Sequence, residues 1–177
     1  MSPFGMPVPG LTELEERVGR KAVAEESTHE WEYVRELSVG RMQSSRYTTE
    51  ERLRWGHLAL AVLSKEYAQE AHSRIISGSE LARVRAYMIH EFGASDSDAA
   101  RQPALLCSYV LENIDMTRAE AASMAEDWRS RPREQLLHLR RIKNMLAPLA
   151  TVQHLLGADD PLRQEGEAWL ALVPKLP

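Results

Sequence analysis

Apolar residues recur at every third or fourth position along most of this 177-residue chain. That spacing places them on one face of an α-helix, and no stretch alternates apolar and polar residues in the manner of a half-buried strand. The pattern therefore predicts a series of helices. In order, they are expected near residues 11–22, 31–37, 50–76, 78–92, 103–114, 118–128, 130–156 and 161–172.

The predicted helix at residues 50–76 is, together with the one at 130–156, the longest in the chain. Its apolar residues fall on two opposite sides, one with Trp55, Leu58 and Val62 and the other with Leu53, His57 and Leu60. A helix that is apolar on two sides is normally surrounded by other helices. At 1.5 Å per residue it would be ~40 Å long. We expect it to be the central helix and to cross the whole domain.

Polar residues mark the expected helix starts. Thr49 is a candidate N-cap for the helix at 50–76, because its hydroxyl can accept from a free backbone N–H group. The pairs Ser77/Glu80 and Thr117/Glu120 match the capping box, in which a hydroxyl and a carboxylate satisfy each other's backbone donors. They predict two further helix starts.

Glycine and proline mark other boundaries. Gly93 is expected to end the helix at 78–92, since glycine tolerates the backbone conformation found after helix C-termini. Pro148 is expected to kink the helix at 130–156, because proline cannot donate to the carbonyl four residues earlier.

Composition supports an all-α fold. The strong helix formers Ala, Leu, Glu and Arg supply 81 residues, whereas the strand-favouring Val, Ile and Thr supply 21. We expect a single compact multi-helix bundle of about six to eight helices over residues 11–177. Residues 1–10 contain three prolines and are expected to form a flexible N-terminal arm. Cys107 is the only cysteine, which excludes an intramolecular disulfide and any CxxC metal or redox pair.

Net charge and targeting signals limit the partners and the cellular location that we expect for this chain. The formal net charge is −4, which excludes a globally basic nucleic-acid coat. The N-terminus has no basic segment of the kind that starts a signal peptide, and no apolar stretch approaches the roughly 20 residues of a membrane span. We expect a cytoplasmic protein without membrane contact. Arginine outnumbers lysine 18 to 4, a usage typical of GC-rich bacterial genomes.

Short catalytic motifs are missing from the sequence. The nine glycines fit neither GxGxxG nor a Walker loop, and neither GxSxG nor HExxH occurs. We assign no catalytic residue and expect no cofactor, and we favour a protein that is not an enzyme.

One carboxylate–histidine set could hold a metal ion. Glu26 and His29 have the ExxH spacing that places both side chains on one helix face, as in di-iron bundles. His57 could join them from the helix at 50–76. Such sites need two ExxH motifs, and only one is present, so an acidic solvated face and a packed core histidine are the favoured interpretation.

The chain contains an acidic segment near its N-terminus and a basic segment further along. Residues 13–36 contain eight glutamates against four basic residues. The later segment has one opposing carboxylate, Glu134, among six cations: Arg129, Arg131, Arg133, Arg140, Arg141 and Lys143. These cations could bind nucleic-acid phosphates. We favour pairing with the acidic segment, within one chain or across a dimer.

The sequence therefore supports three functions, in order of preference. The first is a non-enzymatic regulatory or adaptor protein that acts through charged helical surfaces and self-associates, since segregated charge favours oriented association. The second is nucleic-acid binding through the basic segment. The third is a helical enzyme that depends on a metal or a small molecule bound around Glu26, His29 and His57.

Overall fold

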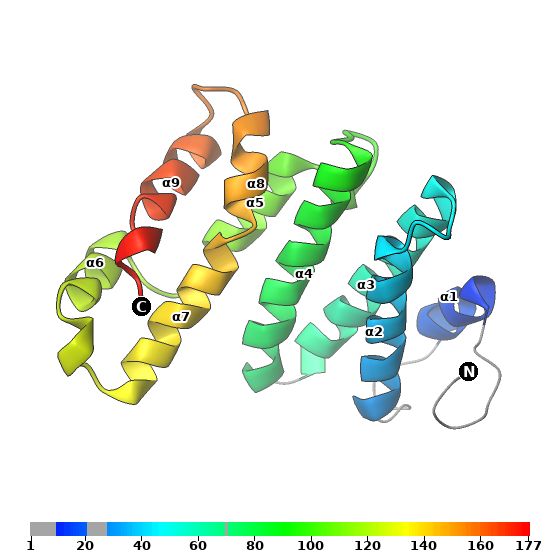
Figure 1. Ribbon diagram of the computed structural model, residues 1–177, viewed down its shortest axis with the longest axis horizontal. Coiled ribbons are helices and arrows are strands. Elements are labelled where there is room, and N and C mark those ends of the chain that lie inside the picture. Colours follow the sequence, from blue (N-terminus) through cyan, green and yellow to red (C-terminus); the bar gives the residue numbers. More distant parts are fainter. Residues whose placement is uncertain (1–9, 21–27, 70) are drawn as a thin grey trace. The chain divides into compact units, whose positions relative to one another are not determined.

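A computed structural model describes residues 10–20, 28–69 and 71–177 of the chain (Figure 1). All regular secondary structure in these ranges is helical, which confirms the predicted all-α class. The chain forms two compact units, Met1–Ser77 and Gly78–Pro177. A single domain over residues 11–177 stays a prediction, and the expected arm at 1–10 lies, except for Gly10, outside the described residues.

The first unit contains α1 (Leu11–Arg20), α2 (Thr28–Gln43) and α3 (Thr49–Gln69). α2 and α3 pack along each other as an antiparallel hairpin, and α1 packs against α3 (Figure 1). Apolar residues three and four positions apart on these helices form the buried core of the unit. Its fully or nearly fully buried side chains include Leu14, Val18, Trp31, Val34, Met42, Trp55, Leu58, Val62 and Leu63.

The start of α3 differs by one residue from the sequence prediction. Thr48, not Thr49, is the capping residue: its Oγ1 accepts from the Glu51 N–H at 3.3 Å, and the Glu51 carboxylate accepts from the Thr48 N–H at 2.9 Å. The Thr48 hydroxyl also donates to the Glu51 carboxylate, at 2.8 Å. The backbone and then the hydroxyl donor of Thr48 lower the pKa of Glu51. A capping box needs its carboxylate three residues after the cap, which selects Thr48 over Thr49.

The predicted helix at 50–76 is wrong in its C-terminal part. α3 ends at Gln69, and α4 (Ala71–Phe92) runs through Ser77 and Glu80, where a new helix start was expected. Gly78 is buried inside α4, and the Tyr109 hydroxyl donates to its carbonyl at 3.4 Å. A glycine inside a helix costs about 1 kcal/mol relative to alanine, and α4 is continuous through Gly78 in spite of that cost.

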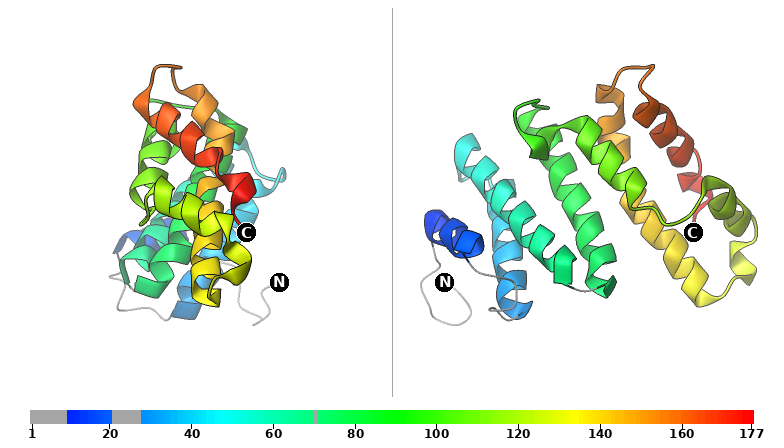
Figure 2. Two further views of the ribbon diagram at one scale, coloured as in Figure 1. Left: turned by 90° about the vertical axis from the view of Figure 1, so that its left-hand side faces the viewer. Right: turned by 180° about the vertical axis from the view of Figure 1, so that it is seen from behind.

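The second unit comprises α4 from Gly78 onward, α5 (Pro103–Glu112), α6 (Arg118–Glu126), α7 (Arg133–Leu146), α8 (Leu149–Val152) and α9 (Pro161–Leu170). α5 packs against α8 and α9, and α6 packs against α7 (Figure 2). The core they share contains, among others, Ile89, Leu106, Cys107, Val110, Leu139, Ile142, Leu146, Leu149 and Trp169.

Several predicted boundaries in this unit are confirmed. Gly93 ends α4 with a φ of 83°, in the left-handed region that favours glycine. Thr117 and Glu120 form the capping box of α6. Pro148 separates α7 from α8, so the predicted helix at 130–156 is divided there. Among the described helices, none has the length and apolar character needed to cross a bilayer.

Candidate functional site

α7 has one buried and one exposed face. Leu139, Ile142, Met145 and Leu146 are buried in the core of the second unit. The opposite face is exposed along the whole helix and carries Arg133, Leu137, Arg140, Arg141 and Asn144. These five positions recur at helical spacing, so their side chains share one side of the helix. We call them the α7 basic face.

The arginines of the α7 basic face have no carboxylate partner within the described part of their own unit. Glu134 follows Arg133 directly in the sequence, yet no ion pair joins it to Arg133, Arg140 or Arg141. Other arginines of the same unit do pair: the guanidinium–carboxylate distances are 2.7 Å for Arg101–Asp98, 3.0 Å for Arg118–Glu165 and 2.8 Å for Arg163–Glu167. The α7 basic face therefore carries three arginines that form no ion pair in the described part of their unit, and the exposed Glu134 in the first turn offsets part of their charge.

The remaining cations of the predicted basic set take other roles. Lys143 Nζ donates to the Leu176 carbonyl at 2.9 Å and is part-buried. Arg131 donates weakly to the Ser123 carbonyl at 3.4 Å, and its Nε is buried without a partner in the described residues. Arg129 is exposed, with its guanidinium carbon 5.1 Å from the Trp128 ring centroid. Lys143 and Arg131 thus contact backbone carbonyls of the second unit, whereas Arg129 is exposed like the arginines of the α7 basic face.

The acidic N-terminal segment is partly neutralised where it lies. Three of its glutamates form ion pairs with arginines of the first unit: Arg17 and Arg35 belong to the acidic segment itself, and Arg54 lies outside it. The donor–acceptor distances are 3.1 Å for Arg54–Glu15, 3.0 Å for Arg17–Glu30 and 3.7 Å for Arg35–Glu32. The hydrogen bond to Glu15 raises the pKa of Arg54.

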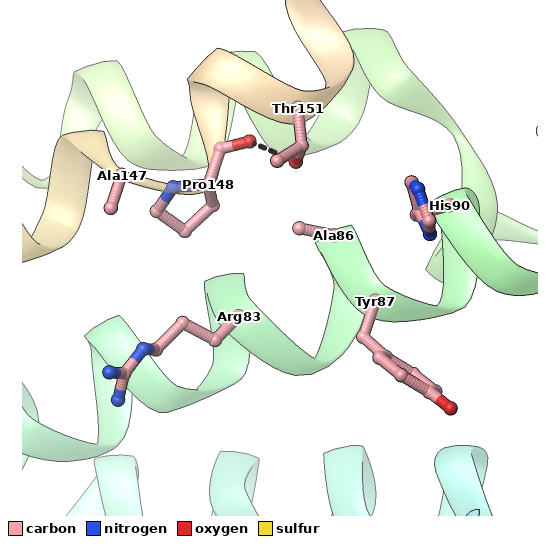
Figure 3. A pocket seen from close by; sticks show the side chains of 7 residues that line it. All are labelled: Arg83, Ala86, Tyr87, His90, Ala147, Pro148 and Thr151. Atoms are coloured by element: carbon pink, nitrogen blue, oxygen red, sulfur yellow. Dashed lines mark hydrogen bonds between the residues drawn. The ribbon is translucent and has the colours of Figure 1, made fainter. Parts of the chain in front are cut away.

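A hollow of about 370 Å³ lies between α4 and the break that separates α7 from α8 (Figure 3). It is lined by Arg83, Ala86, Tyr87 and His90 of α4 and by Ala147, Pro148 and Thr151. Ala86 faces Pro148 across it, with Arg83 and His90 on either side of Ala86 (Figure 3). We call it the α4–α8 hollow. Its volume falls in the range of ~300–1,000 Å³ found for ligand pockets.

A second hollow, of about 510 Å³, lies beside α6. It brings Arg131 together with two carboxylates, Asp115 and Glu120. The Asp115 carboxylate is also 3.2 Å from His138 Nε2. Because the two carboxylates outnumber the one arginine, the charged lining of this hollow is net acidic, which does not suit an acidic partner.

The predicted metal site at Glu26, His29 and His57 stays a prediction, because of its three side chains the structure describes that of His57. His57 is exposed on α3, not buried as a core histidine, because Trp55, Leu58 and Val62 form the packed side of that helix. Glu26 lies outside the described residues, and the side chain of His29 is not described. Within the described ranges, no three or more His, Cys, Asp or Glu side chains form a group that could hold a metal ion.

Cys107 is a buried core residue. Its side chain has no solvent exposure, and burial, with a smaller contribution from the charge of Asp160, raises the pKa of its thiol to about 11. A thiol needs to ionise to act as a nucleophile, so this environment fits packing and not catalysis.

No family model matches the sequence, and comparisons with curated proteins and with solved structures returned no significant match.

Proposed function

We propose that this protein is a non-enzymatic adaptor or regulatory module that binds an anionic macromolecule through the α7 basic face. One observation carries the proposal: Arg133, Arg140 and Arg141 lie on one exposed helix face without a carboxylate partner in the described part of their unit. Unneutralised, oriented charge increases the rate and specificity of association with an oppositely charged partner. The proposed setting is the bacterial cytoplasm.

A protein partner fits this face better than other anions. Leu137 is 40% exposed in the middle of the arginines. A protein surface can cover an apolar side chain while its carboxylates pair with the surrounding guanidinium groups, which is the usual anatomy of an interface. The adaptor function therefore ranks first.

Binding can be tested by fluorescence anisotropy with two labelled probes of matched length. One is an amphipathic peptide of glutamates and leucines, and the other is a single-stranded DNA oligonucleotide. We expect the peptide to bind more tightly. The Arg140→Glu variant should lose at least about tenfold in affinity. Arg46→Glu is the matched control, because Arg46 is exposed in the first unit and its reversal changes the net charge equally. Equal affinities of the two variants would refute a role for the α7 basic face.

Nucleic-acid binding is the second candidate, and the exposed arginines favour it because guanidinium groups pair with phosphates bidentately. It predicts the opposite order of the two probes. It also predicts an oligonucleotide affinity that falls steeply with salt, since each phosphate contact releases counterions.

Self-association belongs to the proposed function as well. A second copy would offer its acidic segment to the α7 basic face, although Glu15, Glu30 and Glu32 already have arginine partners. Light scattering coupled to size exclusion tests this directly. A dimer that dissociates at high ionic strength and in the Arg140→Glu variant would identify the second copy as the partner; a monomer at all salt concentrations would exclude it.

A further inference from the structure

The α7 basic face continues beyond the arginines. Asn144, Ala147 and Thr151 are exposed and follow Arg140 at steps of four, three and four residues. Ala147 and Thr151 also line the α4–α8 hollow. The exposed side of α7 therefore leads from a cationic part, at Arg133 to Arg141, directly into the hollow.

The chemistry of the α4–α8 hollow differs from that of the arginines before it. Ala86, Ala147 and Pro148 present carbon atoms to it (Figure 3). Arg83 and His90 are exposed on its two sides and have no carboxylate partner in the described part of their unit. The hollow thus combines an apolar floor with the positive charge of Arg83 and the polar imidazole of His90 at its rim.

We propose that the α7 basic face and the α4–α8 hollow form one docking site for an acidic protein segment that inserts a large apolar side chain into the hollow. This inference rests on the proposed function and specifies its partner. Carboxylates of the segment pair with Arg140 and Arg141, and its apolar anchor covers Ala86 and Pro148. A few well-packed anchors surrounded by polar contacts account for most of the affinity in such interfaces.

Charge complementarity and the apolar floor together decide the class of partner. A phosphate backbone would pair with the arginines but gains nothing from Leu137 or from the hollow. A peptide that presents an amphipathic helix uses both, because its acidic and apolar side chains alternate at the same three- and four-residue spacing as the exposed positions of α7.

The test is a selection of peptides on the full-length protein. A displayed library of random 16-residue peptides is panned against the immobilised chain, and the affinities of the enriched peptides are then measured by anisotropy. We expect enrichment of peptides in which Asp or Glu residues flank a large apolar residue. Changing that apolar residue to Ser should weaken binding about tenfold or more.

Variants of the protein separate the two parts of the site. Ala147→Trp and, independently, Thr151→Phe place bulk in the hollow, and both should weaken the selected peptides about tenfold or more. Ala150→Trp is the matched control, since Ala150 is exposed on α8 but does not line the hollow. Circular dichroism checks that each variant remains folded.

The outcomes are distinguishable. If Ala147→Trp and Thr151→Phe bind as tightly as Ala150→Trp while the double variant Arg140→Glu/Arg141→Glu loses binding, the hollow is not the anchor site and the proposed function stands. If the selected peptides lack acidic residues, or bind the double variant unchanged, both the docking site and the proposed function are refuted. Enrichment of acidic peptides without an apolar residue overturns the docking site alone.

Discussion

The ammonium group of Lys143 donates a hydrogen bond to the backbone carbonyl of Leu176 at 2.9 Å, which joins the last turn of α7 to the C-terminal segment of the chain. Leu176 itself is only 3% exposed and belongs to the core of the second unit. Lys143 was part of the basic set expected from the sequence, and in the structure it is part-buried and tethers the C-terminal segment.

Replacing Lys143 should therefore affect stability more than binding. Lys143→Met keeps the aliphatic part of the side chain and removes a charged donor, which typically contributes about 1.5–3 kcal/mol. We expect a loss of about 1–2 kcal/mol in the free energy of unfolding, measured with urea, and unchanged affinity for the acidic peptide probe. Arg140→Gln should behave in the opposite way, with near wild-type stability and weaker binding. Equal stability of the two variants would contradict the tether.

Cys107 should react only when the protein opens. Its buried thiol has a pKa of about 11 and is protonated at neutral pH, so a disulfide reagent such as DTNB should label the folded protein very slowly and the urea-unfolded protein at once. Rapid labelling of the folded chain would contradict the burial of this residue.

The same thiol makes stability depend on pH at the alkaline end. The unfolded thiol ionises near its ordinary pKa of about 8.5, whereas the folded thiol keeps its proton up to about pH 11. The unfolded state therefore holds fewer protons in this window, and the free energy of unfolding should fall as the pH rises through it. A Cys107→Ala variant should show a flatter decline between these values, measured by urea unfolding at several pH values.

The capping box of α6 gives a prediction at the acidic end. Hydrogen bonds from the Thr117 hydroxyl and then its backbone N–H lower the pKa of Glu120. Because the pKa of Glu120 is lower in the folded state, its carboxylate stabilises the protein at neutral pH, and this contribution is lost as the pH falls through the folded pKa. Thr117→Ala should cost about 1 kcal/mol at pH 7. Its difference from the wild-type protein should shrink as the pH falls below the ordinary glutamate pKa of about 4.3 and through the lower pKa of the folded Glu120 carboxylate. A pH-independent difference would mean that the carboxylate takes no part in the cap.

Gly93 should be sensitive to a side chain for reasons of backbone geometry alone. A Cβ at this position meets no atom within 4 Å, but the φ of 83° is strained for any residue with a side chain. Gly93→Ala is therefore expected to lower stability by about 1–2 kcal/mol. Gly157→Ala is the control, because it also meets nothing within 4 Å and its φ is not in the strained region. Similar thermal stability of both variants would contradict the prediction.

Local sequence signals predicted the helices well wherever the residues that decide a boundary are neighbours in the chain. The Thr117/Glu120 pair, the glycine at 93 and the proline at 148 all act over one turn, and the structure has each boundary as expected. The Ser77/Glu80 pair has the same local pattern but lies inside α4. Gly78, which lies between them, is buried and accepts from the distant Tyr109 hydroxyl, a contact that no local pattern contains.

The candidate site was predictable in composition but not in detail. The sequence grouped Arg133, Arg140 and Lys143 in one basic segment, and the structure exposes the two arginines and partly buries the lysine. Lys143 has the same chemistry and a neighbouring position, yet its partner is thirty-three residues away in sequence. The α4–α8 hollow combines residues from two helices that are far apart in the chain, so only the tertiary structure reveals it.

Arginine footprinting tests the central claim most directly, because it needs neither a variant nor a known partner. The protein is treated with phenylglyoxal, first alone and then in a lysate of cells that produce it naturally, and the modified arginines are identified by mass spectrometry. We predict that Arg133, Arg140 and Arg141 are modified readily in the isolated protein and are protected in the lysate, while the ion-paired Arg118 and Arg163 are modified to the same extent in both. Equal modification of the three α7 arginines under the two conditions would contradict the claim that this face binds a partner.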